Sequence, residues 1–190
     1  PILGGGRISG TAGPLRIGLL NMQTSRDSAV AAENFSVARV RGDLHPNLTA
    51  GAIVVNRATT TGAKADNRSY GIDADFTALN DYLLVRSYLA ATEGTESDGT
   101  SVDRAYAGRL SVSWDDPLWD IGAMYRQIDE DFTPGVGFVR RRGIRHVYST
   151  VGISPQVFWG VVEELNPSVV THHFTALSGE LETREIGGGM

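Results

Sequence analysis

The stretch DRAYAGRLSVSWDDPLWDIGAMYR, residues 103–126, decides the fold class. Before and after a short polar turn at residues 115–117, every second residue is mostly apolar, and the residues between them are mainly small or charged. Only Met124 breaks the pattern. Because successive side chains of a β-strand point to opposite faces, this period of two predicts an antiparallel hairpin with one apolar face.

Aromatic residues mark both ends of the apolar face of this hairpin. The segment from Tyr106 to Trp114, at about 3.3 Å per residue and tilted by roughly 45°, rises about 19 Å along a barrel axis. That rise is somewhat short of the roughly 25 Å apolar band between the aromatic girdles of an outer-membrane barrel. We therefore expect a lipid-facing surface, with a membrane girdle formed by Tyr70, Phe76, Tyr82, Tyr106, Trp114, Trp119 and Tyr125.

The rest of the chain repeats this unit, and its connections alternate in length. Short turns are expected at residues 11–14, 42–47, 78–81 and 115–117, and longer polar loops at 24–34, 58–67, 93–102 and 127–135. Short periplasmic turns and longer external loops are typical of an up-and-down outer-membrane barrel, whereas a Greek-key sandwich has no reason to alternate in this way. Further strands are expected at residues 146–153, 157–164, 168–175 and 181–186. The predicted fold is all-β, an antiparallel up-and-down transmembrane β-barrel, as a partial barrel of about 10–11 strands. Residues 1–190 would form a single β-barrel domain or a segment of a larger barrel.

Composition excludes several classes of protein. The chain has no cysteine, which rules out disulfides, thiolate metal sites and cysteine nucleophiles. Its net charge is −5 with both signs mixed along the chain, so no basic stripe indicates nucleic-acid binding. No apolar run approaches the length of a transmembrane helix. The first residues already follow a strand-like pattern, so we expect the sequence to begin inside a protein or after processing.

Five stretches carry a resemblance to a known family. They are IGLLNMQT (17–24), AENFSVARVR (32–41), GAIVVNR (51–57), YGIDADF (70–76) and DFTPGVGFVRRRG (131–143). Together they resemble the uncharacterised bacterial outer-membrane β-barrel domain that follows a family 9-like carbohydrate-binding module in large envelope proteins. The resemblance implies an outer-membrane barrel with a carbohydrate-related role through that neighbouring module, which is not within these residues. It implies no catalytic residue and no cofactor.

Arginines are the candidate binding residues of the lumen or its rim. Three consecutive arginines cannot all point into a lumen if they lie in a regular strand, because adjacent side chains alternate between faces. Two interpretations stay open for this cluster. It lies at the rim, paired with acidic residues 129–131 or with lipid phosphate, or it selects anions or acidic sugars at a pore mouth. The candidates are Arg86, Arg109, Arg140, Arg141, Arg142 and Arg145.

Asp73 and Asp75 are the weak catalytic candidates. They share a face predicted to point inward, where two carboxylates could perform acid–base chemistry or bind calcium. The favoured interpretation is that they balance Arg86 or Arg109 across the lumen wall, since inward polar groups need partners. His172 and His173 are adjacent in a strand and face opposite ways, so they cannot jointly bind one metal ion. We predict no metal site and no cofactor.

The leading hypothesis is a non-enzymatic outer-membrane β-barrel segment that acts as an anchor or passage in a carbohydrate-linked envelope system. Its expected location is the bacterial outer membrane, and its partners are outer-membrane lipid and, through the neighbouring module, carbohydrate; no nucleic acid is expected. Two alternatives are an outer-membrane hydrolase acting on glycans and a soluble β-sandwich binding module, whose apolar faces would pack against a second sheet. The oligomeric state stays open.

Overall fold

The computed structural model describes residues 1–27, 30–62, 64–159 and 162–190, without the side chains of residues 156–164. Every regular element in these residues is a β-strand, so the chain is all-β as predicted. No helix in the described residues is both long enough and apolar enough to cross a membrane. The strands are β1 (Ile2–Ala12), β2 (Leu15–Thr24), β3 (Glu33–His45), β4 (Leu48–Thr59), β5 (Asp66–Ala78), β6 (Leu83–Thr95), β7 (Ser101–Asp115), β8 (Trp119–Ile128), β9 (Ile144–Ile153), β10 (Gln156–Trp159), β11 (Val162–Glu164), β12 (Ser168–Ala176) and β13 (Leu181–Gly189).

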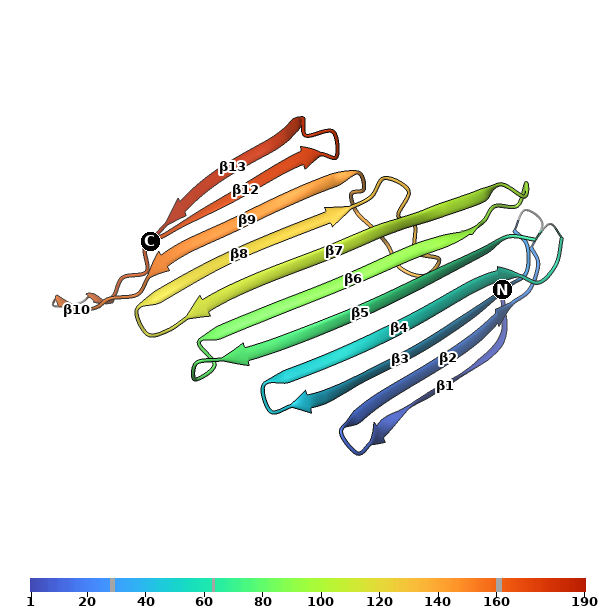
Figure 1. The fold of residues 1–190 in the computed structure, drawn as a ribbon, viewed down its shortest axis with the longest axis horizontal. Coiled ribbons are helices and arrows are strands. Elements are labelled where there is room, and N and C mark those ends of the chain that lie inside the picture. The colour runs from blue at the N-terminus through green and yellow to red at the C-terminus, as the bar shows by residue number, and fades with distance from the viewer. Residues whose placement is uncertain (28–29, 63, 160–161) are drawn as a thin grey trace.

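Eleven of the described strands form one antiparallel sheet in chain order (Figure 1). Each strand pairs with the one before it, and β12 takes the place after β9. This arrangement confirms the up-and-down fold. The sheet is not closed, because β1 and β13 are its two edges, as expected for part of a barrel.

One strand predicted for the sheet is absent from it. Residues 157–164 were expected to form a single strand, but β10 and β11 pair only with each other as a separate hairpin. The reason lies in tertiary pairing: β9 finds its antiparallel partner in β12 over its whole length, which leaves no edge of β9 for this segment.

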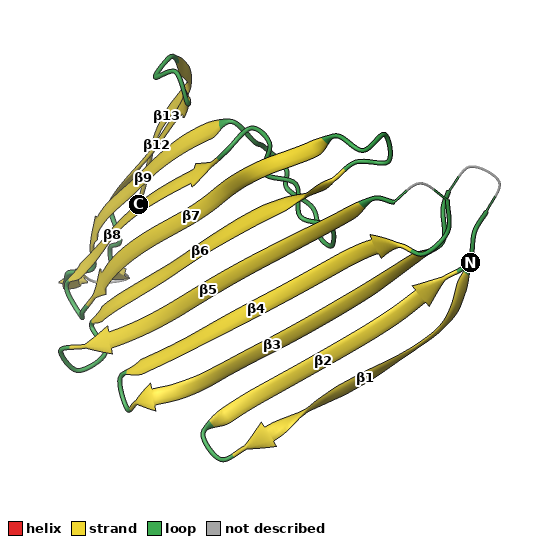
Figure 2. Ribbon diagram, turned by 45° about the vertical axis from the view of Figure 1, so that its right-hand side comes forward, coloured by secondary structure: helices red, strands yellow, loops and turns green. Residues whose placement is uncertain are grey.

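The sheet is strongly curved, as Figure 2 shows, and its two faces differ in chemistry. Cross-strand register places Ile72 beside Ala52 and Leu89, and Leu110 beside Ser87 and Tyr125. We call the face that carries these residues the outer face. The opposite face, which carries Asp73, Asp75, Arg86 and Arg109, is the inner face.

The predicted alternation of connections is found for the first eight. Residues 13–14, 46–47, 79–82 and 116–118 connect strands at one edge of the sheet, and residues 25–32, 60–65, 96–100 and 129–143 connect them at the other. The last two connections reverse this alternation. The long connection at residues 154–167, which contains β10 and β11, lies at the edge of the short turns. The short turn at residues 177–180, which joins β12 to β13, lies at the edge of the long loops.

The packed core is small and lies on the inner face, at the loop edge. It consists of Ala105, Ala107, Ile128, Phe132 and Ile144, with Val139 and Phe174 packed against them. Phe132 and Val139 come from the long connection 129–143 and the others from strands β7, β8, β9 and β12. This loop therefore covers the inner face rather than extending away from the sheet.

Candidate functional site

The outer face carries an apolar surface that no second layer covers in the described part of the chain. Ile72 is 61% exposed, Leu110 49% and Ile121 40%. A β-sandwich would bury these residues beneath another sheet. Similar exposed apolar residues occur on this face along the whole sheet: Ile8, Ile17, Leu19, Val40, Val54, Tyr70, Phe76, Leu89, Tyr106, Val112, Trp119, Tyr125, Val147, Val151, Val169 and Ile186.

A row of polar residues bounds this apolar surface toward the loop edge. Asn21, Ser36, Asn56, Arg68 and Glu93 lie side by side on the outer face of β2 to β6. The Asn21 side-chain amide donates a hydrogen bond of 2.8 Å to the Ser36 hydroxyl. Arg68 and Glu93 form ion pairs with Asp66 and Arg104, which lie outside the row. The apolar residues thus form a band of limited height with a polar boundary on the loop side.

Aromatic residues lie near both boundaries of the apolar band, where the sequence predicted them. Tyr70, Tyr106 and Tyr125 lie toward the loop edge, with between 37% and 47% of their surface exposed. Phe76, Trp114 and Trp119 lie toward the turns, where Tyr82 places its ring 5.9 Å from that of Trp114. Their role as a membrane girdle stays a prediction.

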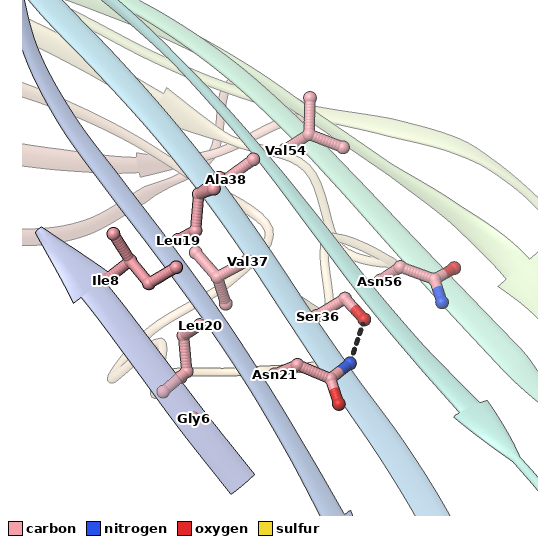
Figure 3. A pocket seen from close by; sticks show the side chains of 10 residues that line it. All are labelled: Gly6, Ile8, Leu19, Leu20, Asn21, Ser36, Val37, Ala38, Val54 and Asn56. Carbon is pink, nitrogen blue, oxygen red and sulfur yellow. Dashed lines mark hydrogen bonds between the residues drawn. The ribbon is translucent and has the colours of Figure 1, made fainter.

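A shallow hollow on the outer face of β1 to β4 has a volume of about 440 Å³ (Figure 3). Ile8, Leu19 and Val54 contribute its larger apolar side chains, while Gly6 and Ala38 leave the space between them. Its only drawn hydrogen bond joins Asn21 to Ser36 at one end. The hollow is therefore an uneven part of the apolar band, with no charged group to orient a ligand.

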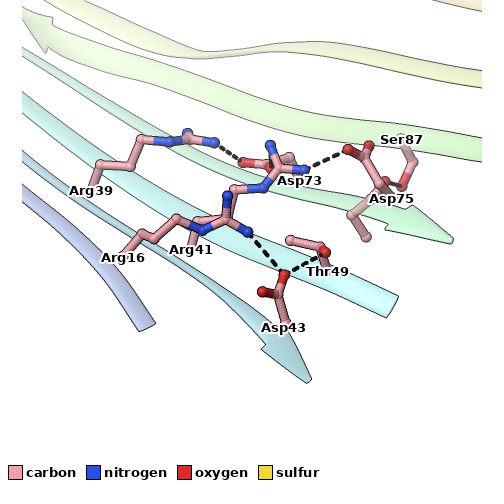
Figure 4. Close-up of polar contacts among 9 residues, drawn as sticks. Arg16, Arg39, Arg41, Asp43, Thr49, Asp73, Asp75 and Ser87 are labelled. Atoms are coloured by element: carbon pink, nitrogen blue, oxygen red, sulfur yellow. Dashed lines mark hydrogen bonds and ion pairs between the residues drawn. The ribbon is translucent and has the colours of Figure 1, made fainter. Parts of the chain in front are cut away.

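The inner face of β3 to β5 carries a network of ion pairs (Figure 4). Arg39 Nη2 lies 2.7 Å from Asp73 Oδ1, and Arg41 bridges Asp73 and Asp75 at 3.4 and 2.5 Å. The sequence correctly predicted inward carboxylates with arginine partners, but these are Arg39 and Arg41 and not Arg86 or Arg109. Register places Arg86 directly opposite Asp75, but the two side chains form no ion pair. Arg41 lies in one row with Gly51 and Asp73, so it reaches Asp73 across β4 where no side chain stands between them. Guanidinium groups engage both carboxylates, which favours a structural role over a catalytic one.

Farther along the inner face, basic and aromatic side chains gather around His146. Arg126 Nη2 lies 3.3 Å from His146 Nδ1, and His146 Nε2 lies 3.1 Å from His172 Nδ1. The His146 ring stacks on Phe174 with centroids 3.9 Å apart. Strand register brings these residues together, because β8, β9 and β12 are neighbours. His172 lies on this face and the adjacent His173 on the other, as predicted.

The loop formed by residues 129–143 lies over this cluster and is anchored at several points. Phe132 is only 7% exposed, and the Asn67 amide of β5 donates to the Thr133 carbonyl at 2.8 Å. The Gly135 amide donates to Asn67 Oδ1 at 2.6 Å, and a Cβ atom at Gly135 would approach the same oxygen to 2.8 Å. A side chain at Gly135 would therefore force this contact apart. The apolar residues of this loop are buried against the inner face, so the loop folds back over the sheet. Whether the loop edge is the external side stays a prediction.

The predicted binding arginines are divided between the two faces and the loop. Arg86 and Arg109 lie on the inner face, and Arg140 and Arg141 lie in the covering loop. Arg141 forms an ion pair with Glu182 and places its guanidinium carbon 5.1 Å from the centre of the Phe174 ring.

The other two candidates are Arg142, which lies in the same loop, and Arg145 of β9. Arg142 donates to the Thr133 hydroxyl at 2.5 Å, and Arg145 lies on the outer-face parity, where it donates to the Gln127 side chain at 3.3 Å. The expected pairing with acidic residues 129–131 is not found among these contacts. The consecutive arginines belong to a loop, so the alternation rule for strands does not apply to them.

The sequence did not single out Arg126, His146 or Tyr88 as site residues. Tyr88 and Arg109 are direct neighbours, and so are Arg109 and Arg126, and Arg126 and His146. The alternation within each strand predicts that each of these residues faces inward, but only the strand register shows that the four residues form one row. No group of three or more acidic, histidine or cysteine side chains that could hold a metal ion occurs among the described residues.

Comparison with known proteins adds no assignment. No protein-family model matches the chain, and no curated protein matches it significantly.

Proposed function

We propose that this chain is a lipid-facing wall of a bacterial outer-membrane β-barrel that acts as a non-enzymatic membrane anchor or passage. The observation that carries the proposal is the uncovered apolar band on the outer face of the eleven-stranded sheet. Soluble monomers rarely expose contiguous apolar patches larger than a few hundred Å².

The total surface area supports the same proposal. The chain exposes 12406 Å², whereas a compact soluble protein of 20.4 kDa exposes about 8,800 Å². A single curved layer of strands explains the excess, since neither face is fully covered. Acyl chains would cover the outer face at no cost in backbone hydrogen bonding for the strands between the two edges, because each of these is paired on both sides, whereas the edges of β1 and β13 need a neighbouring strand.

The inner face favours a water-filled side. It carries the Arg39–Asp73 and Arg41–Asp75 ion pairs, which would be costly against lipid. Short turns at one edge and longer loops at the other follow the pattern of outer-membrane barrels for most of the sheet. The carbohydrate-linked role that the sequence resemblance implies is part of this proposal.

Quenching of tryptophan fluorescence by brominated lipid tests the lipid-facing wall. The chain is folded into vesicles in a Trp159→Phe background, so that Trp114 and Trp119 report on the outer face. We expect strong quenching by bromine near the lipid headgroups and heat-modifiable migration on denaturing gels. A chain that folds as a stable monomer in plain buffer, or tryptophans that brominated lipid does not quench, would overturn the proposal.

A further inference from the structure

We propose that the inner face binds an oxyanion carried by a small acidic solute, in the cavity between the loop 129–143 and the strands beneath it. The cavity has a volume of about 680 Å³, which is in the range of small-molecule sites. Tyr88, Arg126, Phe138, Arg140, Arg141 and Phe174 line it. The proposal does not depend on lipid at the outer face, because the cavity opens on the opposite side of the sheet.

The first argument is the balance of charge along the inner face. In β2 to β5 the arginines are matched: Arg16, Arg39 and Arg41 each lie within ion-pair distance of an aspartate. Around the cavity they are not matched. Among the side chains that the structure describes, Arg109, Arg126 and Arg140 have no carboxylate within 4.0 Å, and only Arg141 has one. Positive charge is thus concentrated where the loop covers the sheet.

The second argument is an unpaired donor inside this region. Arg126 Nε is buried and has no hydrogen-bond partner among the described residues. The Arg126 Nη2 atom faces a histidine nitrogen at 3.3 Å instead of an anion. A buried guanidinium N–H without an acceptor is costly, and an oxyanion supplies the acceptor and the compensating charge together.

The third argument is the convergence of several basic groups on one point. Arg109 and Arg126 are direct cross-strand neighbours, and Arg126 is the neighbour of His146. Arg141 comes from the loop and lies over the Phe174 ring, which stacks on His146. An arginine fork binds a carboxylate, sulfate or phosphate through two parallel hydrogen bonds. Basic groups contributed by β7, β8 and the loop can therefore surround one oxyanion.

The aromatic lining indicates what carries the oxyanion. Phe138 lines the cavity and is 86% exposed, so its ring is free to contact a solute there. Together with Tyr88 it provides flat apolar surfaces on which a ring, such as that of a uronic acid, can pack. The solute class is accordingly a small ring compound with a carboxylate, sulfate or phosphate group.

Calorimetric titration of the folded chain in detergent micelles tests the site. The probes are glucuronate, inorganic sulfate and inorganic phosphate, with glucose as the uncharged control. We expect the three anions to bind more tightly than glucose, and more weakly as sodium chloride is raised. Tighter binding of glucuronate than of the inorganic ions would identify an acidic sugar as the solute, and equal binding would identify the free oxyanion. Anions that bind no better than glucose overturn the proposal.

Substitutions locate the site within the inner face. Arg140→Gln changes an exposed loop residue and should raise the dissociation constant about tenfold, which equals about 1.4 kcal/mol. Arg109→Gln should have a similar effect. Arg16→Gln is the matched control, because it removes the same charge from the same face at an arginine paired with Asp43. If the control weakens binding as much as Arg140→Gln does, the effect is general electrostatics and the site is refuted.

Discussion

The stability cost of an arginine at Leu110 distinguishes an outer face in contact with lipid from one in contact with water. Leu110 is 49% exposed on the outer face and lies midway along β7 between Tyr106 and Trp114. If acyl chains contact this face, Leu110→Arg places a charge near the middle of the apolar band, which costs about 2–4 kcal/mol in outer-membrane barrels. That cost lowers the ratio of folded to unfolded protein by about thirtyfold to nearly a thousandfold. If water contacts the face, the substitution should change the stability by no more than about 0.5 kcal/mol.

The assay is reversible urea unfolding in lipid vesicles, followed by tryptophan fluorescence and by heat-modifiable gel migration. Ser113→Arg is the control on the same strand, because Ser113 lies on the inner face and has Asp115 and Asp120 nearby. We expect the control to stay within about 0.5 kcal/mol of the wild type. Equal stabilities for the two variants would refute the assignment of the outer face to lipid.

Three further predictions concern the turns and the inner face. The Asp116 carboxylate accepts hydrogen bonds from the Trp114 indole and from two backbone amides of its turn, and the indole hydrogen bond is the largest cause that lowers its pKa. The carboxylate therefore stabilises the folded state above the unfolded pKa of 3.8, and this stabilisation is lost as the pH falls through the lower folded pKa. Asp116→Asn should lower the free energy of unfolding at neutral pH, and the difference from the wild type should disappear as the pH is lowered in acid-titration experiments. A double-mutant cycle of Arg39→Gln and Asp73→Asn should give a coupling free energy of about 0.5–1 kcal/mol in unfolding experiments, and a value near zero would refute a stabilising role for this ion pair. Phe132→Ala should destabilise the protein by about 3 kcal/mol and expose the consecutive arginines of its loop to trypsin, whereas Phe138→Ala, at a residue 86% exposed, should leave the cleavage rate unchanged.

The face on which most strand residues lie could be predicted from local alternation. Ile72, Leu110 and Ile121 are on one face and Asp73 and Asp75 on the other, as the period of two requires. The boundaries of most connections followed from turn residues in the same way. These features could be predicted because parity and turn chemistry depend on neighbours in the sequence.

The site was predicted less completely. Arg109, Arg140 and Arg141 were candidates and lie at or near the cavity, but Arg126 and His146 were not identified. A basic residue in an alternating strand gives no sign of what lies on the next strand. The partners of Asp73 were wrongly expected on β6 or β7 and are found on β3, because Gly51 of β4 leaves the space between Arg41 and Asp73 open.

The amino-acid sequence by itself determined the all-β class, the two chemically different faces and the rhythm of the first eight connections. Only the tertiary structure decided that β10 and β11 pair apart from the main sheet, that β12 pairs with β9, and that the loop 129–143 lies over the inner face. Alternation is a property of consecutive residues, so one strand suffices to read it. Register and loop placement depend instead on hydrogen bonds and apolar contacts between residues far apart in the chain, such as those of Asn67 with Thr133 and Gly135.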